Sequence, residues 1–356
     1  MLCGKGKLVM KDQETKQPAT LKHIAEKMGY SVNTISRALR DKDDIATETR
    51  EMIQKTAREM GYINNMIASS LRLGYTKTIA VILGDVSNPH FGIMMKEIEE
   101  HARKLGYSSF LLNTNEDEEL ERKAIKNALN KNVDGIIICP VQKSRDNINF
   151  LKSTNVPFVL LGRRFDEIPT DYVVCNDELG GYQATKYLLD SGHKNILMVH
   201  APLYIFSSRE RLKGYKRALK ERKIKIKPEL IIEMPVAGGG CEKIFDDLFK
   251  NKIKFTAIFA FSDLLAWDIW TYFHKKGYKV PKDFSIIGFD HIQSRLSFPF
   301  QLNSVSSYKG RISIEAVNIL VQKMNNKSDK KQLNELVIDT SLVEGETVIS
   351  YHTRKI

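Results

Sequence analysis

The sequence lacks a long apolar segment. None of the apolar runs in its 356 residues approaches the roughly 18 residues that a membrane-spanning helix needs. The opening stretch, MLCGKGKLVMKDQETKQ, also lacks the apolar core of a secretory signal peptide. We therefore expect a protein that stays in the cytoplasm.

Cysteines and catalytic motifs are also scarce. The four cysteines, Cys3, Cys139, Cys175 and Cys241, have none of the close spacing of a zinc or redox site, so we expect reduced thiols and no metal. The sequence contains no phosphate loop, no His-Glu-x-x-His and no Gly-x-Ser-x-Gly, and the glycines at 238–240 lack the spacing of a dinucleotide site. These absences argue against an enzyme.

Basic residues outnumber acidic residues in the sequence. The formal net charge is +12, which suits a polyanionic partner but is weak support until the charge is localised. Two basic stretches, at 220–227 and 323–331, lie far from the N-terminus. We interpret both as solvated helix ends and loops.

From residue 78 onward, short apolar runs alternate with helical stretches. Runs such as IAVILG, GIIIC, NILMVH, TAIFAF and FSIIGF are apolar throughout, as expected for strands of parallel sheets that are covered on both faces. A chain of this length should hold more than one folding unit. Two successive α/β halves fit the pattern best.

Residues 19–39, ATLKHIAEKMGYSVNTISRAL, have the pattern of two short helices joined at a glycine. Thr20 can cap the first helix and Gly29 can end it, while Ser31 can cap the second. The second helix would bury Ile35 and Ala38. With a third helix expected over 47–60, the segment predicts a helix-turn-helix.

The outward side of the second helix carries residues suited to DNA bases. Asn33 and Arg37 are four residues apart, so both can enter one major groove, where asparagine suits adenine and arginine suits guanine. An ordinary helical hairpin with a solvated polar face would show the same periodicity. The residues of this segment that we expect to contact DNA are Thr20, Ser31, Val32, Asn33, Thr34, Ser36 and Arg37.

Several fragments along the chain share a family pattern. Residues 20–37 read T-L-x-x-I-A-x-x-M-G-Y-S-x-x-T-I-S-R, followed by GYINN at 61–65 and ASSL at 68–71. Further fragments are DVSNPHF at 85–91, VDGII at 133–137, SGHKNI at 191–196, RLKGY at 211–215 and VPKDFSIIGFD at 280–290. In this order and at these separations, they resemble the lactose-repressor (LacI/GalR) family.

The resemblance implies a fold and its boundaries. It implies an N-terminal all-α helix-turn-helix headpiece and an α/β effector domain of two periplasmic-binding-protein-like subdomains, with chain crossovers that periodicity does not reveal. We expect a disordered tail at 1–17, the headpiece at 18–61 and a hinge linker at 62–77. The N-subdomain would comprise 78–175 and 307–338, and the C-subdomain 176–306 and 339–356.

The linker is also expected to touch DNA. In the family it forms a hinge helix that folds when two protomers meet on the operator, and its leucine enters the minor groove. We expect Leu71 and Asn65 to contact DNA here, although Leu71 could instead pack at a domain interface. Asn64 replaces a common proline and Ser69 a common arginine, which predicts a looser linker. His23 replaces an acidic residue, which removes a carboxylate from the start of the first helix.

Ligands of parallel sheets bind beyond the carboxyl ends of the strands. The residues that we expect to bind an effector there are Asp85, Phe91, Arg163, Arg211, Ser262 and Asp290. The resemblance implies that Arg211 holds an effector oxygen and that Asp290 accepts from sugar hydroxyls. Ser262 stands where the family usually has asparagine, and the Arg163-Arg164 pair leaves room for a sugar acid or sugar phosphate.

Structural explanations remain open for three of these residues. Phe91 could be a core residue that starts a helix. Arg211, placed in the first turn of a helix at 209–222, could form a surface ion pair with its neighbour Glu210. Asp290 could cap a loop.

The favoured function is a sequence-specific transcription regulator, by resemblance a repressor of carbohydrate genes. It would bind operator DNA as a homodimer, need no cofactor, and respond to a small sugar or sugar derivative. The last residues show no leucine heptads, which favours a dimer over a tetramer. A solute-binding protein for sugar uptake or a sugar-converting enzyme could share the α/β body, but neither needs the headpiece.

Overall fold

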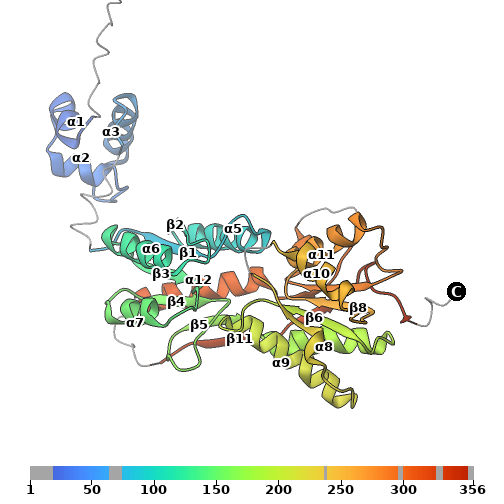
Figure 1. The fold of residues 1–356 in the computed structure, drawn as a ribbon. Coiled ribbons are helices and arrows are strands. Elements are labelled where there is room, and N and C mark those ends of the chain that lie inside the picture. Colours follow the sequence, from blue (N-terminus) through green and yellow to red (C-terminus); the bar gives the residue numbers. More distant parts are fainter. Residues whose placement is uncertain (1–18, 64–73, 236–238, 296–299, 326–331, 352–356) are drawn as a thin grey trace, which may run out of the picture. The chain divides into compact units, whose positions relative to one another are not determined.

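The computed structural model describes residues 19–63, 74–235, 239–295, 300–325 and 332–351. The chain divides into two compact units, Met1–Gly74 and Tyr75–Ile356, here called the headpiece and the body (Figure 1). Within the described ranges, no helix is both long enough and apolar enough to cross a membrane.

Three helices form the described part of the headpiece. They are α1 (Leu21–Met28), α2 (Val32–Ala38) and α3 (Thr47–Glu59). Gly29 ends α1 with a left-handed backbone, at φ 70°. The helices enclose a small apolar core of Ile24, Ala25, Ile35, Ala38, Ile53 and Ala57. The helix-turn-helix expected from the sequence is thereby confirmed.

The described part of the body contains two six-stranded sheets. The first consists of β1 (Thr78–Leu83), β2 (Ser108–Asn113), β3 (Gly135–Ile138), β4 (Phe158–Leu161), β5 (Tyr172–Cys175) and β11 (Glu335–Ile338), in the order β11-β5-β4-β3-β1-β2. The second consists of β6 (Ile196–His200), β7 (Ile231–Glu233), β8 (Ala257–Ala260), β9 (Ser285–Phe289), β10 (Asn303–Ser306) and β12 (Ser341–Val343), in the order β12-β10-β9-β8-β6-β7. Among the described strands, β12 and β10 form the one antiparallel pair.

Helices cover both faces of each sheet (Figure 1). The N-lobe, built on the first sheet, has α5 (Pro89–Lys104), α6 (Glu118–Asn130), α7 (Asp146–Ser153) and α12 (Lys309–Asn325). The C-lobe, built on the second, has α8 (Asp177–Asp190), α9 (Phe206–Glu221), α10 (Cys241–Lys250) and α11 (Asp263–Lys275). Two short 3-10 helices, η1 (Pro228–Leu230) and η2 (Ile292–Ser294), complete the C-lobe. The predicted two-lobed α/β architecture is confirmed.

Helices α8 and α9 approach each other closely because glycines face the contact. A Cβ atom on Gly181 would lie 2.2 Å from the Arg211 backbone oxygen, and one on Gly214 would lie 2.1 Å from the Glu178 backbone oxygen. Real side chains do not tolerate such distances. The close packing fixes the position of α9, the helix that carries Arg211.

Some local expectations need correction. Helix α9 begins at Phe206 rather than at residue 209, so Arg211 lies in its second turn. Helix α7 and strand β10 were not foreseen. The proposed hinge helix, with Asn64, Ser69 and the two DNA-contact candidates Asn65 and Leu71, lies outside the described residues.

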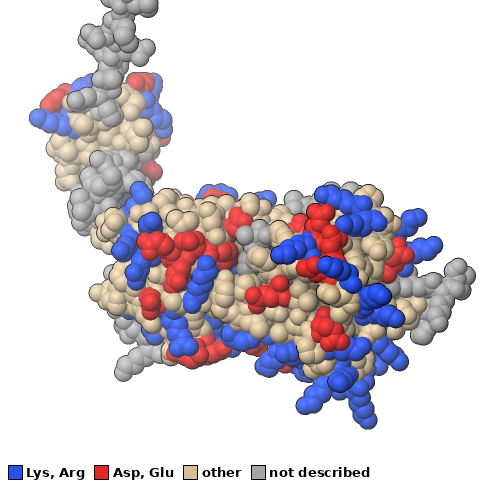
Figure 2. Space-filling model, viewed as in Figure 1, with Lys and Arg blue, Asp and Glu red and all other residues tan. Residues whose placement is uncertain are grey.

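The surface of the body carries charge of both signs. Over the face shown in Figure 2, lysine and arginine side chains are interspersed with aspartate and glutamate. Arg222, Lys223 and Lys225, in the basic stretch at 220–227, are exposed. This stretch is solvated, as expected.

Candidate functional site

The start of α1 is fully capped. The Thr20 hydroxyl accepts a hydrogen bond from the His23 backbone N–H at 3.3 Å, and His23 Nδ1 accepts one from the Thr20 backbone N–H at 3.3 Å. This reciprocal arrangement is a capping box, usually completed by glutamate or glutamine. The first turn has no acidic residue, as the sequence indicated. The imidazole nevertheless supplies the acceptor that a carboxylate would have supplied.

Ser31 and Thr34 hold the start of α2. The Ser31 hydroxyl accepts from the Thr34 backbone N–H at 3.0 Å, and the two hydroxyl oxygens lie 2.8 Å apart. Val32 and Asn33, in the first turn, are exposed. Helix N-termini are where a recognition helix meets base edges. The cap therefore fixes the turn that presents Val32 and Asn33.

Arg37 lies in the last turn of α2 and is not free. Its Nη2 donates to Asp44 Oδ2, in the connection between α2 and α3, and about half of each side chain is exposed. Ser36, by contrast, is half-buried. Sequence reasoning selected Arg37 but missed Asp44, whose only signal was its place in the acidic run DKDD that follows the helix.

A small cavity lies between the two lobes of the body. Its volume is about 80 Å³. Five of the six predicted effector residues line it: Phe91, Arg163, Arg211, Ser262 and Asp290. Asp85 does not; its carboxylate accepts from the Ser87 backbone N–H at 2.9 Å and so stabilises a turn.

Arg211 is a buried residue held by several partners. Its Nε donates to Asp177 Oδ1 at 2.8 Å and its Nη1 donates to the Phe261 carbonyl. The guanidinium also lies over the Phe289 ring, with Cζ 3.5 Å from the ring centroid. The interpretation as a surface ion pair with Glu210 is therefore wrong. Arg211 Nη2 lies 3.6 Å from Asp290 Oδ1, at the edge of the cavity.

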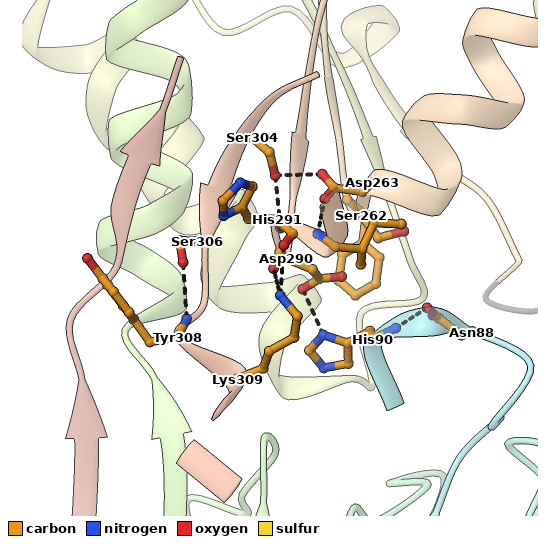
Figure 3. A network of polar contacts seen from close by, with 12 residues as sticks. Asn88, His90, Ser262, Asp263, Asp290, His291, Ser304, Ser306, Tyr308 and Lys309 are labelled. Atoms are coloured by element: carbon orange, nitrogen blue, oxygen red, sulfur yellow. Dashed lines mark hydrogen bonds and ion pairs between the residues drawn. The ribbon is translucent and has the colours of Figure 1, made fainter. Parts of the chain in front are cut away.

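Asp290 faces the cavity from an unusual backbone conformation. Its φ is 99° and that of His291 is 49°, a region that residues other than glycine rarely adopt. The buried Lys309 ammonium donates to the carbonyls of Asp290 and His291, at 2.7 and 2.8 Å (Figure 3). Lys309, at the start of α12, therefore holds the loop that presents the Asp290 carboxylate. Sequence reasoning missed Lys309.

His90 meets Asp290 across the cavity. His90 comes from α5 in the N-lobe, and its Nδ1 lies 3.6 Å from Asp290 Oδ1 (Figure 3). Burial lowers the pKa of His90 to about 4, although the nearby Asp290 acts to raise it, so the imidazole is uncharged at neutral pH. Within the described residues, Nδ1 has no hydrogen-bond partner. The Nδ1 atom is thus both buried and, in the described part of the chain, without a hydrogen bond.

The other predicted residues that line the cavity, Phe91, Arg163 and Ser262, also have structural roles. Phe91 is buried in the main core and also lines the cavity. The guanidinium of Arg163 is bound by both carboxylate oxygens of Glu116, at 2.7 and 2.8 Å. Ser262 caps α11 by accepting from the Leu265 backbone N–H at 3.3 Å.

Asp263, next to Ser262, organises the floor of this region. Its carboxyl accepts from the Ser304 hydroxyl at 2.6 Å (Figure 3). It also accepts from the Ile292 backbone N–H at 2.8 Å. Complete burial, with a further contribution from Asp290, raises the pKa of Asp263 to about 8. The carboxyl that caps the loop after β9 is therefore that of Asp263 and not that of Asp290.

The cysteines described in the structure are inert. Cys139 and Cys175 are buried and Cys241 is half-buried, and none forms a disulfide. Burial raises the pKa of Cys139 to about 12, so its thiol stays protonated. Within the described residues, no three His, Cys, Asp or Glu side chains are placed to hold a metal ion.

A helix-turn-helix unit followed by two α/β lobes around a cavity with charged side chains in its lining defines a ligand-responsive DNA-binding protein. Comparison with known families agrees. Residues 20–65 match the family described as bacterial regulatory proteins, lacI family. Residues 76–342 match the family described as periplasmic binding proteins and sugar binding domain of LacI family. The chain belongs to the LacI family and is a DNA-binding transcriptional regulator.

Individual relatives extend over nearly the full chain. The HTH-type transcriptional repressor PurR of Pasteurella multocida is 30% identical over 322 residues, which cover 89% of this chain and 96% of the relative. PurR of Actinobacillus pleuropneumoniae is 31% identical, with 90% and 95% covered. Among solved structures, the lac repressor dimer bound to operator and the anti-inducer ONPF has a TM-score of 0.82 at 23% identity, with 94% and 100% covered.

A further similar structure contains a bound sugar. A LacI family regulator from Enterococcus faecium with bound ribose has a TM-score of 0.66 and is 26% identical, with 77% of this chain and 99% of that chain covered.

Proposed function

We propose that the protein represses transcription by binding a pseudo-palindromic operator as a homodimer, in the cytoplasm. A small sugar-like effector in the cavity between the lobes would change its affinity for that operator. The exposed Val32, Asn33 and Arg37 of α2 would read the major groove of each half-site. The expected minor-groove contact of Leu71 and the contact of Asn65 belong to the same proposal.

The observation that carries the effector proposal is the unbonded pair His90 and Asp290. The two side chains come from different lobes and approach to 3.6 Å, which is too long for a hydrogen bond. A ligand hydroxyl could donate to the Asp290 carboxylate and bond to His90 Nδ1 at once. Occupancy of the cavity would then be linked to the spacing of the lobes.

The charges around the cavity favour an uncharged, hydroxyl-rich ligand. Arg163 is neutralised by Glu116 and Arg211 by Asp177. The carboxylates of Asp290 and Asp268, which also line the cavity, are then left as acceptors. A sugar fits these groups better than a sugar acid or sugar phosphate does. The ribose bound to the Enterococcus faecium relative supports the same ligand class.

The size of the cavity suggests how binding is transmitted. Sites for small ligands usually measure about 300–1,000 Å³, so a cavity of about 80 Å³ has to widen around a sugar ring. We propose that this widening shifts the lobes and, through the linker, the two reading helices. Such coupling between sites typically changes affinity about 5–150-fold.

Two other functions have less support. A solute-binding protein for sugar uptake would share the two-lobed body but would have no use for the headpiece. An enzyme could also share the two-lobed body, but we propose that the protein has no catalytic activity. Turnover of a sugar by the purified protein, lost in Asp290→Ala, would contradict this view.

The DNA-binding function can be tested by selection. Full-length protein would be used to enrich duplexes from a random library, and binding would be measured by fluorescence anisotropy. We expect a palindromic duplex bound at least about 1,000-fold more tightly than random DNA, with one dimer per duplex by sedimentation. Enrichment of no sequence above random DNA would refute the proposal.

The effector site can be tested with thermal shifts. Ribose, D-xylulose and cellobiose would be compared with gluconate and glucose 6-phosphate as probes, because a ligand of the native state raises the melting temperature. We expect a neutral sugar to stabilise the protein and Asp290→Asn to abolish the shift. Asp85→Asn, which lies outside the cavity, is the matched control and should retain it. Stabilisation by the acidic sugars alone would contradict the proposed ligand class.

A further inference from the structure

The connection between α2 and α3 carries three aspartates with different partners. Asp41 accepts from Gln54 Nε2 at 2.7 Å and lies 3.7 Å from Arg50 Nε. Asp43 is exposed, and no bond to its side chain occurs within the described residues. Asp44 alone engages Arg37, the arginine on the outward side of α2.

The connection is held firmly enough to fix Asp44 in place. Gln54 Nε2 donates to the Ala38 carbonyl at 3.2 Å, and the Lys42 backbone N–H donates to the Arg37 carbonyl at 3.2 Å. Ile45, the residue after Asp44, packs against the headpiece core. The backbone at Asp44 therefore has little freedom to move away from the end of α2.

The pair contributes little to folding because it is exposed. About half of each side chain is open to solvent, and exposed ion pairs are largely offset by side-chain entropy and screening. Its position matters more for recognition. Only Nη2 of Arg37 engages Asp44 within the described residues, so Nε–H and Nη1–H stay available to an acceptor on the DNA.

A carboxylate beside the arginine affects the two kinds of DNA contact in opposite ways. It restricts the orientation of the guanidinium, which favours the fixed two-point geometry of a guanine edge. It also repels phosphate and cancels the charge that would attract it. A free arginine at this position would reach for the phosphate backbone, which carries no sequence information.

We propose that Asp44 is a positioning residue that directs Arg37 to a guanine edge and keeps it from the phosphates. This inference rests on the proposed DNA-binding function, and it assigns a specificity role to a residue that need not touch DNA. Its consequence is that the headpiece gains selectivity and loses affinity for random DNA.

The test compares Asp44→Asn with the matched control Asp43→Asn in the full-length protein. Both substitutions remove one negative charge from neighbouring exposed positions, but only the first releases Arg37. Binding to the selected duplex and to a random duplex of equal length would be measured by anisotropy between about 50 and 200 mM salt. Circular dichroism would check that both variants are folded.

We expect Asp44→Asn to bind random DNA more tightly and to lose about fivefold or more of the ratio between selected and random DNA. Its salt dependence on random DNA should steepen by about 0.9 in log–log slope, equal to one added phosphate contact. Asp43→Asn should change affinity for both duplexes by the same factor and leave the slope unchanged. Asp44→Glu, which keeps the carboxylate, should recover much of the selectivity.

Two results would overturn the inference. Equal behaviour of Asp44→Asn and Asp43→Asn would show that Asp44 acts only through its charge. A higher selectivity in Asp44→Asn would show that the pair hinders base reading. If the wild-type protein selects no duplex, the proposed function fails, yet the slopes on random DNA still decide whether Asp44 restrains Arg37.

Discussion

The headpiece and the body both contain arginines paired with carboxylates, but the two settings differ. Arg37 and Asp44 in the headpiece are about half exposed, whereas Arg163 with Glu116 and Arg211 with Asp177 in the body are buried. Water can readily replace a lost partner at the exposed site, and much less readily at the buried sites. The same pairing can therefore tune recognition in one unit and hold the architecture of a cavity in the other.

The strongest test of this comparison removes one partner of a buried pair. Glu116→Gln should destabilise the body by about 3–5 kcal/mol, because the buried Arg163 would keep its charge after losing its carboxylate partner. Both tryptophans, Trp267 and Trp270, lie in the body, so denaturation followed by tryptophan fluorescence reports on that unit. Asp44→Asn should change headpiece stability by less than about 1 kcal/mol, as followed by amide hydrogen exchange.

A double variant tests whether the stability lost in Glu116→Gln results from the unpaired charge of Arg163. Glu116→Gln combined with Arg163→Met removes both charges, and it should recover much of the lost stability. If the double variant is no more stable than Glu116→Gln alone, the unpaired charge of Arg163 is not the cause of the lost stability. The different behaviour of the ion pairs in the headpiece and the body would then not result from their burial.

Removing the exposed arginine should affect recognition instead of folding. Arg37→Ala should cost about 1–3 kcal/mol on the selected duplex and relax the preference at one operator position. Random DNA should be affected much less, because Asp44 keeps Arg37 from the phosphates. The measurement is anisotropy on duplexes that vary one base pair at a time. Equal losses on selected and random DNA would make Arg37 a backbone contact.

Periodicity predicted most of the secondary structure because most elements have a clear apolar pattern. The runs at 135–139 and 256–261 became β3 and β8. Helix α7 was missed because it is short and lacks a side-chain cap. Strand β10, NSVS, is fully buried yet polar, so no apolar pattern marks it.

The candidate site was less predictable than the fold, because its contacts join distant parts of the chain. His90 lies across the cavity from Asp290, and Lys309 holds the Asp290 loop from a different helix. No local spacing marks such pairs. Asp44 was missed for a related reason, since only the path of the α2–α3 connection brings it to Arg37.

Burial should also make the stability of the body depend on pH. The ordinary pKa of aspartate is about 3.8, whereas that of Asp263 is raised to about 8. Between these values the folded state holds a proton that the unfolded state has released, so stability falls as pH rises through this window. We expect a loss of about 1 kcal/mol between roughly pH 7 and 8.5, where the lowered pKa of His90 contributes little.

Asp263→Asn provides the control for this pH dependence. An amide resembles the protonated carboxyl in offering one acceptor and one donor, so the bonds to Ser304 and Ile292 can persist. The variant should lack the alkaline loss in melting temperature that tryptophan fluorescence detects in the wild type. Identical pH profiles for the two proteins would mean that Asp263 is already ionised at neutral pH.

The smallest expected effect is at the exposed cap of α1, where a charge can be added instead of removed. His23→Glu should keep the bond to the Thr20 backbone N–H and add a favourable interaction with the helix N-terminus, of about 0.3–1 kcal/mol. His23→Gln keeps an acceptor without charge, so the difference between the two variants isolates the electrostatic part. Amide hydrogen exchange over residues 23–29 would detect it as slower exchange in His23→Glu, reduced by added salt. Equal exchange in both variants would mean that solvent screens the N-terminus of α1 completely, and that a charge placed at this exposed cap does not stabilise the headpiece.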